Sequence, residues 1–486
     1  MPYLLVSACW IIFAASLIHF VSTDRKFHTI VRDDRYYLMA LILLGVVAAG
    51  CGYIWPFYGI EYEDAFEYTY SGILLAYQLP PRTESLNSIC VSGSLEHCRS
   101  FMTLAHPIGL AVLVSWLPLR MRWWNHSAQI LSTLASILTG LLTFLASRRW
   151  RNSPLAAGIS AGLLFLTPSF FALWHTGLAE PVGAFLIICA VIFSYRLVET
   201  WGEDAHRGCW IEALYALELV CVLLLGTLVK RENAALTLVL PLVLLFQRRD
   251  AHPRHRLDLR TMMKLLATSG VAALAQLFLL TTDMFALDAV RPSAAPLFSI
   301  ANFAVLAPQY LFDFADNRYS VLPLCFLIGV VYTIRLDWCR ALLLILSIYI
   351  MMICSFAQDR SFVAVGKIPH FHFERYTLQI APIVVLCAGA GAERCIRLIY
   401  RSRVWFYRTF RAVVLLSLAT VLVFSIRAGL MLKRNYYGEE QISELAPARK
   451  LCEVSTGSGE IVSDRPLLIT LVCGPGVDVL DSLPAQ

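Results

Sequence analysis

The chain has 486 residues, of which 58% are hydrophobic and 15% are charged, and its mean hydropathy is +0.65. Soluble domains carry about 25% charged residues and rarely repeat long apolar runs, so this composition excludes a soluble globular protein. The net charge of +6 does not indicate nucleic-acid binding, because basic residues of membrane proteins gather in the loops on one side of the bilayer.

Apolar runs recur along the chain and predict an all-α polytopic membrane protein with about twelve transmembrane helices. The first run, residues 3–22, lacks a basic leader and a small-residue cleavage site, which favours a span over a removed signal peptide. A short basic loop, residues 24–35, is then expected on the cytoplasmic side. The remaining predicted spans cover residues 36–55, 127–147, 154–173, 182–198, 211–229, 234–246, 262–281, 321–334, 341–356, 376–392 and 412–426.

Two long loops are predicted on the external side. The first, residues 56–125, contains an apolar stretch at 103–119 that is short and rich in proline and tryptophan, which favours an amphipathic helix in the interface. If this stretch spanned the bilayer, all later loops would invert. With it in the interface, more than half of the 40 Lys and Arg fall in short cytoplasmic loops. The second loop, 283–319, is also expected to hold an interfacial helix.

The sequence divides into a transmembrane domain, residues 1–428, and a small external tail, residues 429–486, without an internal repeat. Two pairs of cysteines are expected on the external side, Cys90 with Cys98 and Cys452 with Cys473. External cysteines are compatible with disulfides and with free thiols, and the sequence leaves both open.

An acidic cluster directly follows the predicted span 36–55. Glu61, Glu63, Asp64 and Glu67 lie within seven residues of one another. A carboxylate near hydrocarbon is costly unless it contacts water, a cation or a substrate, so the cluster is a candidate functional site. Glu67 is also compatible with a solvated helix face, whereas Asp64 is the residue for which a structural role is hardest to find.

Further polar residues are expected on the same external face, namely His106, His175, Glu180, Lys230, Arg231, Glu232, Arg360, Lys367, His370, His372 and Arg375. Carboxylates suit the activation of a hydroxyl group or the binding of a metal, and clustered cations suit a phosphate. Both together at a lipid–water boundary indicate a lipid phosphate as one substrate. Simpler interpretations exist: Lys230 and Arg231 could snorkel at a hairpin tip, and the pair of histidines lacks a nearby third ligand for zinc.

These motifs, in this order and on one face, resemble the GT-C superfamily of membrane glycosyltransferases. The sequence looks most like the protein O-mannosyltransferases and the lipid A aminoarabinose transferase family. Four short motifs carry the resemblance: Glu61-Tyr-Glu63-Asp64, Leu178-Ala-Glu180-Pro181, Lys230-Arg231, and His372-Phe-Glu-Arg375-Tyr376 followed by Pro382. The resemblance implies a helical fold with interfacial helices in the first external loop. It also implies inverting transfer of a sugar from a polyprenyl-phosphate donor to an acceptor hydroxyl at the external face.

The resemblance also implies roles for individual residues. Asp64 or Glu63 would act as the general base, with Asp64 favoured, and Glu180 would orient the acceptor or the base. The family's usual first motif is Asp-Glu or Asp-X-Asp, so the Glu-X-Glu-Asp found here leaves the base open between the two. Substrate binding is expected from Glu61, Lys230, Arg231, His370, His372 and Arg375, with the cations neutralising the departing phosphate.

We expect a metal-free site without a cofactor. The alternative is a divalent cation (Mg, Mn or Ca) held by Glu61, Asp64 and Glu180, because carboxylate oxygens suit these ions. The expected partners are the polyprenyl-phosphate-linked sugar and a glycan, lipid or protein acceptor, with no nucleic acid. The expected location is the bacterial inner membrane with the site facing the periplasm, although an endoplasmic reticulum topology would give the same pattern.

A transporter or a lipid or polysaccharide flippase is the alternative function. Transporters place ionisable groups near the bilayer midplane and often contain repeated halves. The predicted span interiors look free of charged residues and the chain shows no repeat, which favours the enzyme. A scaffold that binds the acceptor without catalysis is a third possibility, which would tolerate alanine at all the acidic positions.

Overall fold

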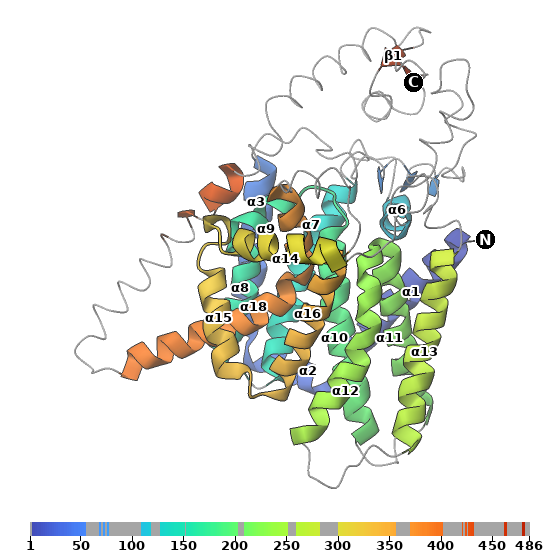
Figure 1. The fold of residues 1–486 in the computed structure, drawn as a ribbon, viewed down its shortest axis with the longest axis horizontal. Coiled ribbons are helices and arrows are strands. Elements are labelled where there is room, and N and C mark those ends of the chain that lie inside the picture. Colours follow the sequence, from blue (N-terminus) through green and yellow to red (C-terminus); the bar gives the residue numbers. More distant parts are fainter. Residues whose placement is uncertain are drawn as a thin grey trace.

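The structure is a computed structural model of the chain (Figure 1). It describes residues 2–54, 68–69, 71–72, 75–76, 108–117, 127–150, 152–202, 209–250, 259–281, 300–355, 370–401, 420, 423–424, 426–431, 461–463 and 479–481. These residues are almost entirely helical.

The helices follow one another along the chain and pack into one bundle (Figure 1). Two of them, η2 and η4, are 3₁₀-helices, and the rest are α-helices. Their bounds are α1 (Pro2–Thr23), α2 (Arg25–Asp33), α3 (Arg35–Ile54), α6 (Gly109–Ser115), α7 (Ser127–Arg149), α8 (Pro154–Leu166), α9 (Pro168–Leu173), α10 (Glu180–Gly202), α11 (Cys209–Val229), η2 (Arg231–Leu238), α12 (Val239–Asp250), α13 (Leu259–Thr281), α14 (Ile300–Phe314), η4 (Asn317–Tyr319), α15 (Leu322–Thr333), α16 (Asp337–Ser355) and α18 (His370–Arg401).

The predicted class of helical integral membrane protein is confirmed. Seven of the described helices are long and apolar enough to cross a membrane, and the number rises to eight if α2 and α3, bent by 81° at their junction, form one span. Two shorter apolar helices, α8 and α15, join them in the bundle. The predicted number of about twelve spans is not confirmed by the part of the chain that the structure describes.

Helix α10 is the central element of the bundle. Its residues 180–198 are all buried, and it packs against α7, α11, α12 and α18. Helix α13, in contrast, exposes large apolar side chains such as Leu266 and Leu274, as expected of a helix that faces lipid. The buried part of α10 therefore begins at Glu180 and reaches to Glu199, which is half-buried.

The predicted span 154–173 consists of two helices. Helix α8 ends at Leu166 and α9 begins at Pro168, with Thr167 between them in an extended conformation (φ −72°, ψ 121°). Proline clashes with the helical conformation of the residue before it and lacks a backbone N–H, so Pro168 ends one helix and can begin the next.

The prediction that residues 24–35 form a loop is wrong, because these residues form helix α2 and its junctions with α1 and α3. Asp24 caps this helix by accepting a hydrogen bond from the backbone N–H of Phe27 at 3.0 Å. None of its nine residues is fully buried, so α2 lies along the surface of the bundle. It lies toward the end of the bundle opposite to α6 (Figure 1).

The stretch 103–119 contains the short helix α6, which at seven residues is far too short to span a membrane. The prediction that it does not span is therefore supported, but its apolar side chains are not left to the interface. Leu110, Val112 and Val114 are buried within the protein, where α6 contacts α1, α7 and α11, and Trp10 Nε1 donates to Gly109 O at 3.0 Å.

The second long loop contains a helix, as predicted. Helix α14 lies across the bundle rather than along it and exposes Leu311 and Phe312 (Figure 1). In the tail, the three-residue strands β1 (Ile461–Ser463) and β2 (Val479–Asp481) pair in parallel. Cys90, Cys98, Cys452 and Cys473, the cysteines predicted on the external side, lie outside the described residues.

Candidate functional site

Glu180 is placed by the turn that connects α9 to α10. Gly177 in this turn has a φ of 75°, a left-handed conformation that glycine adopts without a Cβ clash. Helix α7 holds the turn at two points: Ser132 Oγ donates to Leu178 O at 2.9 Å, and Thr133 Oγ1 contacts His175 Nδ1 at 3.1 Å. The side chain of Glu180, the first residue of α10, is therefore fixed where the buried helix begins.

Lys230 lies at a break between α11 and η2. Its backbone is extended (φ −149°, ψ 128°), while its N–H still donates to Gly226 O at 2.9 Å and so completes the last turn of α11. The eight-residue η2 that follows is unusually long for a 3₁₀-helix, a conformation that often marks a functional or strained position. The predicted span 234–246 is thus η2 followed by α12.

Arg375 approaches from the second turn of α18. Its Nε donates to Glu180 Oε1 at 2.8 Å, and Lys230 Nζ lies 2.8 Å from the same oxygen. The exposed fraction of the side chain is 1% for Glu180, 7% for Lys230 and 11% for Arg375. We call these three residues the Glu180 cluster.

The Glu180 cluster carries two positive charges and one negative charge in a buried position. Removing ions from water is costly, and their mutual attraction offsets this cost only where the geometry is good. Replacing buried ion pairs by apolar residues of similar volume is often neutral or stabilising, so a stable core alone does not explain these charges. An ammonium and a guanidinium group suit an anion such as a phosphate.

A layer of neutral polar side chains lies next to the Glu180 cluster. The Tyr349 hydroxyl lies 3.0 Å from Asn233 Oδ1 and also contacts Gln379 Oε1, and all three residues are buried. A Cβ at Gly183, one turn along α10 from Glu180, would meet Asn233 Nδ2 at 3.2 Å. This packing leaves little room for the ion cluster to move deeper into the bundle.

The structure brings together three of the predicted site residues, Glu180, Lys230 and Arg375. The adjacent Arg231 is half-buried at the start of η2, and the two cations that contact Glu180 Oε1 come from Lys230 and Arg375. The interpretation of Lys230 as a snorkelling side chain is wrong, because its amine is buried against Glu180.

Of the other polar residues predicted on this face, His175 is buried beside Thr133 and Glu232 is half-buried in η2, and the rest lie outside the part of the chain that can be described. This applies to the whole acidic motif, Glu61, Glu63, Asp64 and Glu67, and to the side chains of His370 and His372, whose backbone begins α18. Among the described residues, no group of three His, Cys, Asp or Glu side chains is arranged to hold a metal ion. The choice between a metal-free site and a site with Glu61, Asp64 and Glu180 as ligands stays a prediction.

The expectation that the span interiors lack charged residues is wrong. Arg196 of α10 and Glu218 of α11 are both buried, with Arg196 Nη1 donating to Glu218 Oε2 at 3.3 Å, and His19 Nδ1 lies 3.0 Å from Glu218 Oε1. All three residues were visible within their apolar runs in the sequence. Their positions relative to one another were not, because they come from three different helices.

The polar layer of Asn233, Tyr349 and Gln379 was also missed by the sequence analysis. The spacing of the residues in the sequence could have revealed two of them. Asn233 follows Lys230 by three residues and Gln379 follows Arg375 by four, which are the spacings of neighbours on a helix face. A polar residue one turn from a site residue lies on the same helix face and is a candidate for the same site.

No protein-family model matches the chain, and no curated protein matches it by sequence. Among solved structures, the chain is similar to ArnT from Cupriavidus metallidurans in two states. The apo state has 14% identity and a TM-score of 0.51, and the match covers 90% of this chain and 85% of ArnT. The state bound to undecaprenyl phosphate has 13% identity and a TM-score of 0.50, with the same coverage.

The apo form of the Archaeoglobus fulgidus oligosaccharyltransferase is matched over 92% of this chain, with 13% identity and a TM-score of 0.49. The match covers 64% of that enzyme, so the chain spans less than two thirds of its length. The likeness to the two ArnT structures shows that the chain has their fold. The fold expected from the GT-C resemblance is therefore confirmed.

Proposed function

We propose that the protein is a membrane glycosyltransferase that moves a sugar from a polyprenyl-phosphate donor to an acceptor hydroxyl, with inversion at the anomeric carbon. The observation that carries the proposal is the buried Glu180 cluster, in which an ammonium and a guanidinium group contact one carboxylate oxygen at one end of a bundle with the ArnT fold. The ArnT structure with undecaprenyl phosphate supports the choice of donor, because that protein binds a polyprenyl phosphate.

Lys230 and Arg375 stabilise the leaving group in this proposal. As the acceptor oxygen forms its bond to the anomeric carbon, the bond from that carbon to the phosphate oxygen breaks and its electron pair stays on the phosphate. An ammonium and a guanidinium already fixed in a buried site stabilise this growing charge more than mobile cations in water would. Arg231, His370 and His372 are proposed as further contacts to the phosphate or the sugar.

Glu180 holds the two cations in place. Both contacts fall on its Oε1 atom, so a single carboxylate oxygen fixes the distance between an amine from α11 and a guanidinium from α18. Glu180 is therefore proposed as a positioning residue for Lys230 and Arg375. The resemblance alone implied only that Glu180 orients the acceptor or the base. Asp64 is proposed as the general base that takes the acceptor proton, with Glu63 as the alternative and Glu61 contacting the substrate.

The proposed donor is a polyprenyl-phosphate-linked sugar, and the acceptor is a glycan, lipid or protein outside the cytoplasm. The proposed location is the bacterial inner membrane, with the Glu180 end of α10 facing the periplasm. A transporter or flippase remains the alternative, supported by the buried charges of Arg196 and Glu218 within the spans.

The test is a transfer assay with the purified protein in nanodiscs. Wild type, Asp64→Asn and Lys230→Gln are incubated with a panel of polyprenyl-phosphate sugars and a crude envelope acceptor, and free polyprenyl phosphate is followed by mass spectrometry. We expect release from one donor by wild type only, with losses of at least about 100-fold in each variant.

Lys264→Gln is the matched control for Lys230→Gln. Lys264 also forms an ion pair, with Glu212, but it lies near the start of α13 and away from the Glu180 cluster. We expect this control to keep its transfer activity. Binding of the donor by wild type without release would contradict the enzyme and support transport or binding, and full activity of Asp64→Asn would overturn the assignment of the base.

A further inference from the structure

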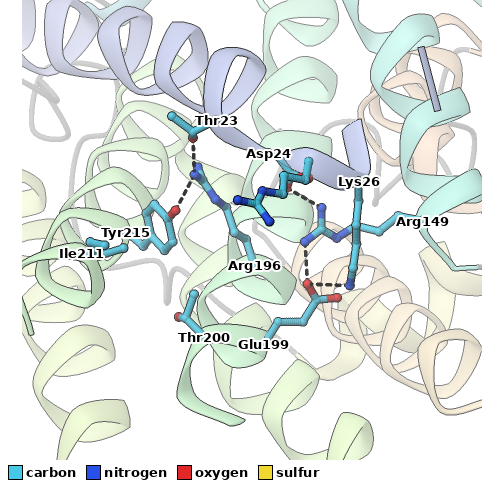
Figure 2. A pocket seen from close by; sticks show the side chains of 10 residues that line it. Thr23, Asp24, Lys26, Arg149, Arg196, Glu199, Thr200, Ile211 and Tyr215 are labelled. Atoms are coloured by element: carbon cyan, nitrogen blue, oxygen red, sulfur yellow. Dashed lines mark hydrogen bonds and ion pairs between the residues drawn. The ribbon is translucent and has the colours of Figure 1, made fainter. Parts of the chain in front are cut away.

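A second charged site lies at the other end of α10, far from the Glu180 cluster. A cavity of about 350 Å³ opens there where α1 meets α2, beside the ends of α7, α10 and α11 (Figure 2). It is lined by Thr23, Asp24, Arg25, Lys26, Arg149, Arg196, Glu199, Thr200, Ile211 and Tyr215. Four cations and two carboxylates among these residues give the lining a net positive charge.

Two buried guanidinium groups form the inner wall of the cavity. Arg149 bridges two acids, with Nη1 2.7 Å from Asp24 Oδ2 and Nη2 2.6 Å from Glu199 Oε2. Arg196 Nη2 donates to Tyr215 OH at 2.7 Å, and the guanidinium lies 3.7 Å from the centre of the Tyr215 ring (Figure 2). Arg196 Nη1 also donates to Glu218 Oε2 at 3.3 Å, so each of the two guanidinium groups is already paired with a carboxylate.

The outer wall carries the charge that is not neutralised. Arg25 and Lys26 occupy the first turn of α2, where the helix dipole adds further positive potential. Both are exposed, and Arg25 forms no ion pair with any residue that the structure describes. Lys26 Nζ lies 3.2 Å from Glu199 Oε2, but its side chain is 60% exposed. An anion could therefore contact Arg25 and Lys26 without breaking the inner ion pairs.

One side of the cavity adjoins the apolar outer surface of the bundle. Helices α1 and α11 pack against each other and expose Ile18, Val21, Ile211 and Leu214. Ile211 belongs to both surfaces, because it lines the cavity and is also 40% exposed. A ligand that fits both surfaces has an anionic head and apolar chains.

We propose that this cavity binds the phosphate headgroup of an anionic phospholipid, with the acyl chains lying along α1 and α11. The site is distinct from the proposed donor site, because Glu180 and Glu199 are 19 residues apart on α10, about 28 Å along the helix axis. The bound lipid fills the space between α2 and the central helix. The proposal does not depend on the proposed transferase activity.

The test is native mass spectrometry of the purified full chain with phosphatidylglycerol or phosphatidylcholine added. We compare wild type with Arg25→Gln/Lys26→Gln. The control is Arg32→Gln/Arg35→Gln, which removes the same charge from exposed residues of the same segment that do not line the cavity. We expect wild type to retain phosphatidylglycerol over phosphatidylcholine, and the cavity variant to bind it at least about tenfold more weakly while the control is unchanged.

Equal weakening in the two double variants would overturn the proposal, because it would show only a general attraction between basic residues and anionic lipid. A competition on wild type separates the two sources of phosphate. Excess inorganic phosphate or glycerol phosphate is not expected to displace the lipid, because neither makes contacts along α1 and α11. Full displacement by inorganic phosphate would assign the cavity to a free anion and overturn the lipid site.

Discussion

The two ends of α10 carry the same arrangement of charges in different surroundings. At one end Glu180 Oε1 contacts Lys230 and Arg375, and at the other Glu199 Oε2 contacts Arg149 and Lys26. Glu180 has 1% of its side chain exposed, whereas Glu199 has 24%. Water screens ion pairs near the surface, whereas a buried charge that loses its partner has nothing to replace it. The same triad of charges should therefore be much more sensitive to substitution at the Glu180 end.

Glu180→Gln is expected to have the largest effect. It leaves the charges of Lys230 and Arg375 buried without the carboxylate, which should lower the free energy of unfolding by about 3 kcal/mol or more. The measurement is thermal unfolding in detergent followed by tryptophan fluorescence, together with the transfer assay. We expect the variant to lose sugar transfer even at temperatures where it remains folded. An unchanged melting temperature would contradict the expectation that the buried ion pairs of Glu180 stabilise the fold.

Glu199→Gln is the matched substitution at the other end of the same helix. Arg149 keeps its contact with Asp24, and Lys26 turns to solvent, so the loss should be only about 1 kcal/mol. The same unfolding experiment measures it, and sugar transfer should not change. A loss equal to that of Glu180→Gln would show that burial does not explain the difference between the two ends.

Tyr349→Phe tests the layer of neutral polar side chains that lies next to the Glu180 cluster. Removing the hydroxyl leaves Asn233 and Gln379 without this contact, and the expected loss is about 1 kcal/mol. Tyr37→Phe on the exposed face of α3 is the control, and its stability should not change. Equal melting temperatures for the two variants would mean that the layer does not stabilise the bundle.

The smallest effect is expected from acid at the Glu199 end. Burial raises the pKa of Asp24. The charge and hydrogen bond of Arg149 and the hydrogen bond from the Phe27 N–H together lower it by more than burial raises it, so the pKa lies below its ordinary value of 3.8. A carboxyl with a lowered pKa stabilises the folded state above the ordinary value, and this contribution is lost as the pH falls through the lowered pKa.

The difference in melting temperature between wild type and Asp24→Asn should therefore be constant from pH 7 to about pH 5 and shrink below about pH 4. A difference that grows on acidification would reverse the assigned direction of the shift. Asn at position 24 still caps α2, so this comparison isolates the charge from the cap.

The sequence predicts most of the membrane helices and places Glu180, Lys230 and Arg375 on one face. The apolar runs gave α1, α3, α7, α10, α11, α13 and α16 within a few residues, because the period and length of such a run are local properties. It failed at α2, where a charged amphipathic segment was interpreted as a loop, and at Thr167, where Pro168 divides one predicted span into two helices.

The sequence by itself determined that this protein is a helical membrane protein, because apolar runs of about 20 residues with few charges have one low-energy structure in lipid. It also determined that Glu180, Lys230 and Arg375 lie at the same end of the bundle, since span order fixes the side on which each helix ends. Only the tertiary structure decided which charges pair. Glu180 and Arg375 are 195 residues apart, and Arg196 pairs with Glu218 from the next helix. Ion pairs depend on the rotation and contact of packed helices, which hydrophobic periodicity does not specify.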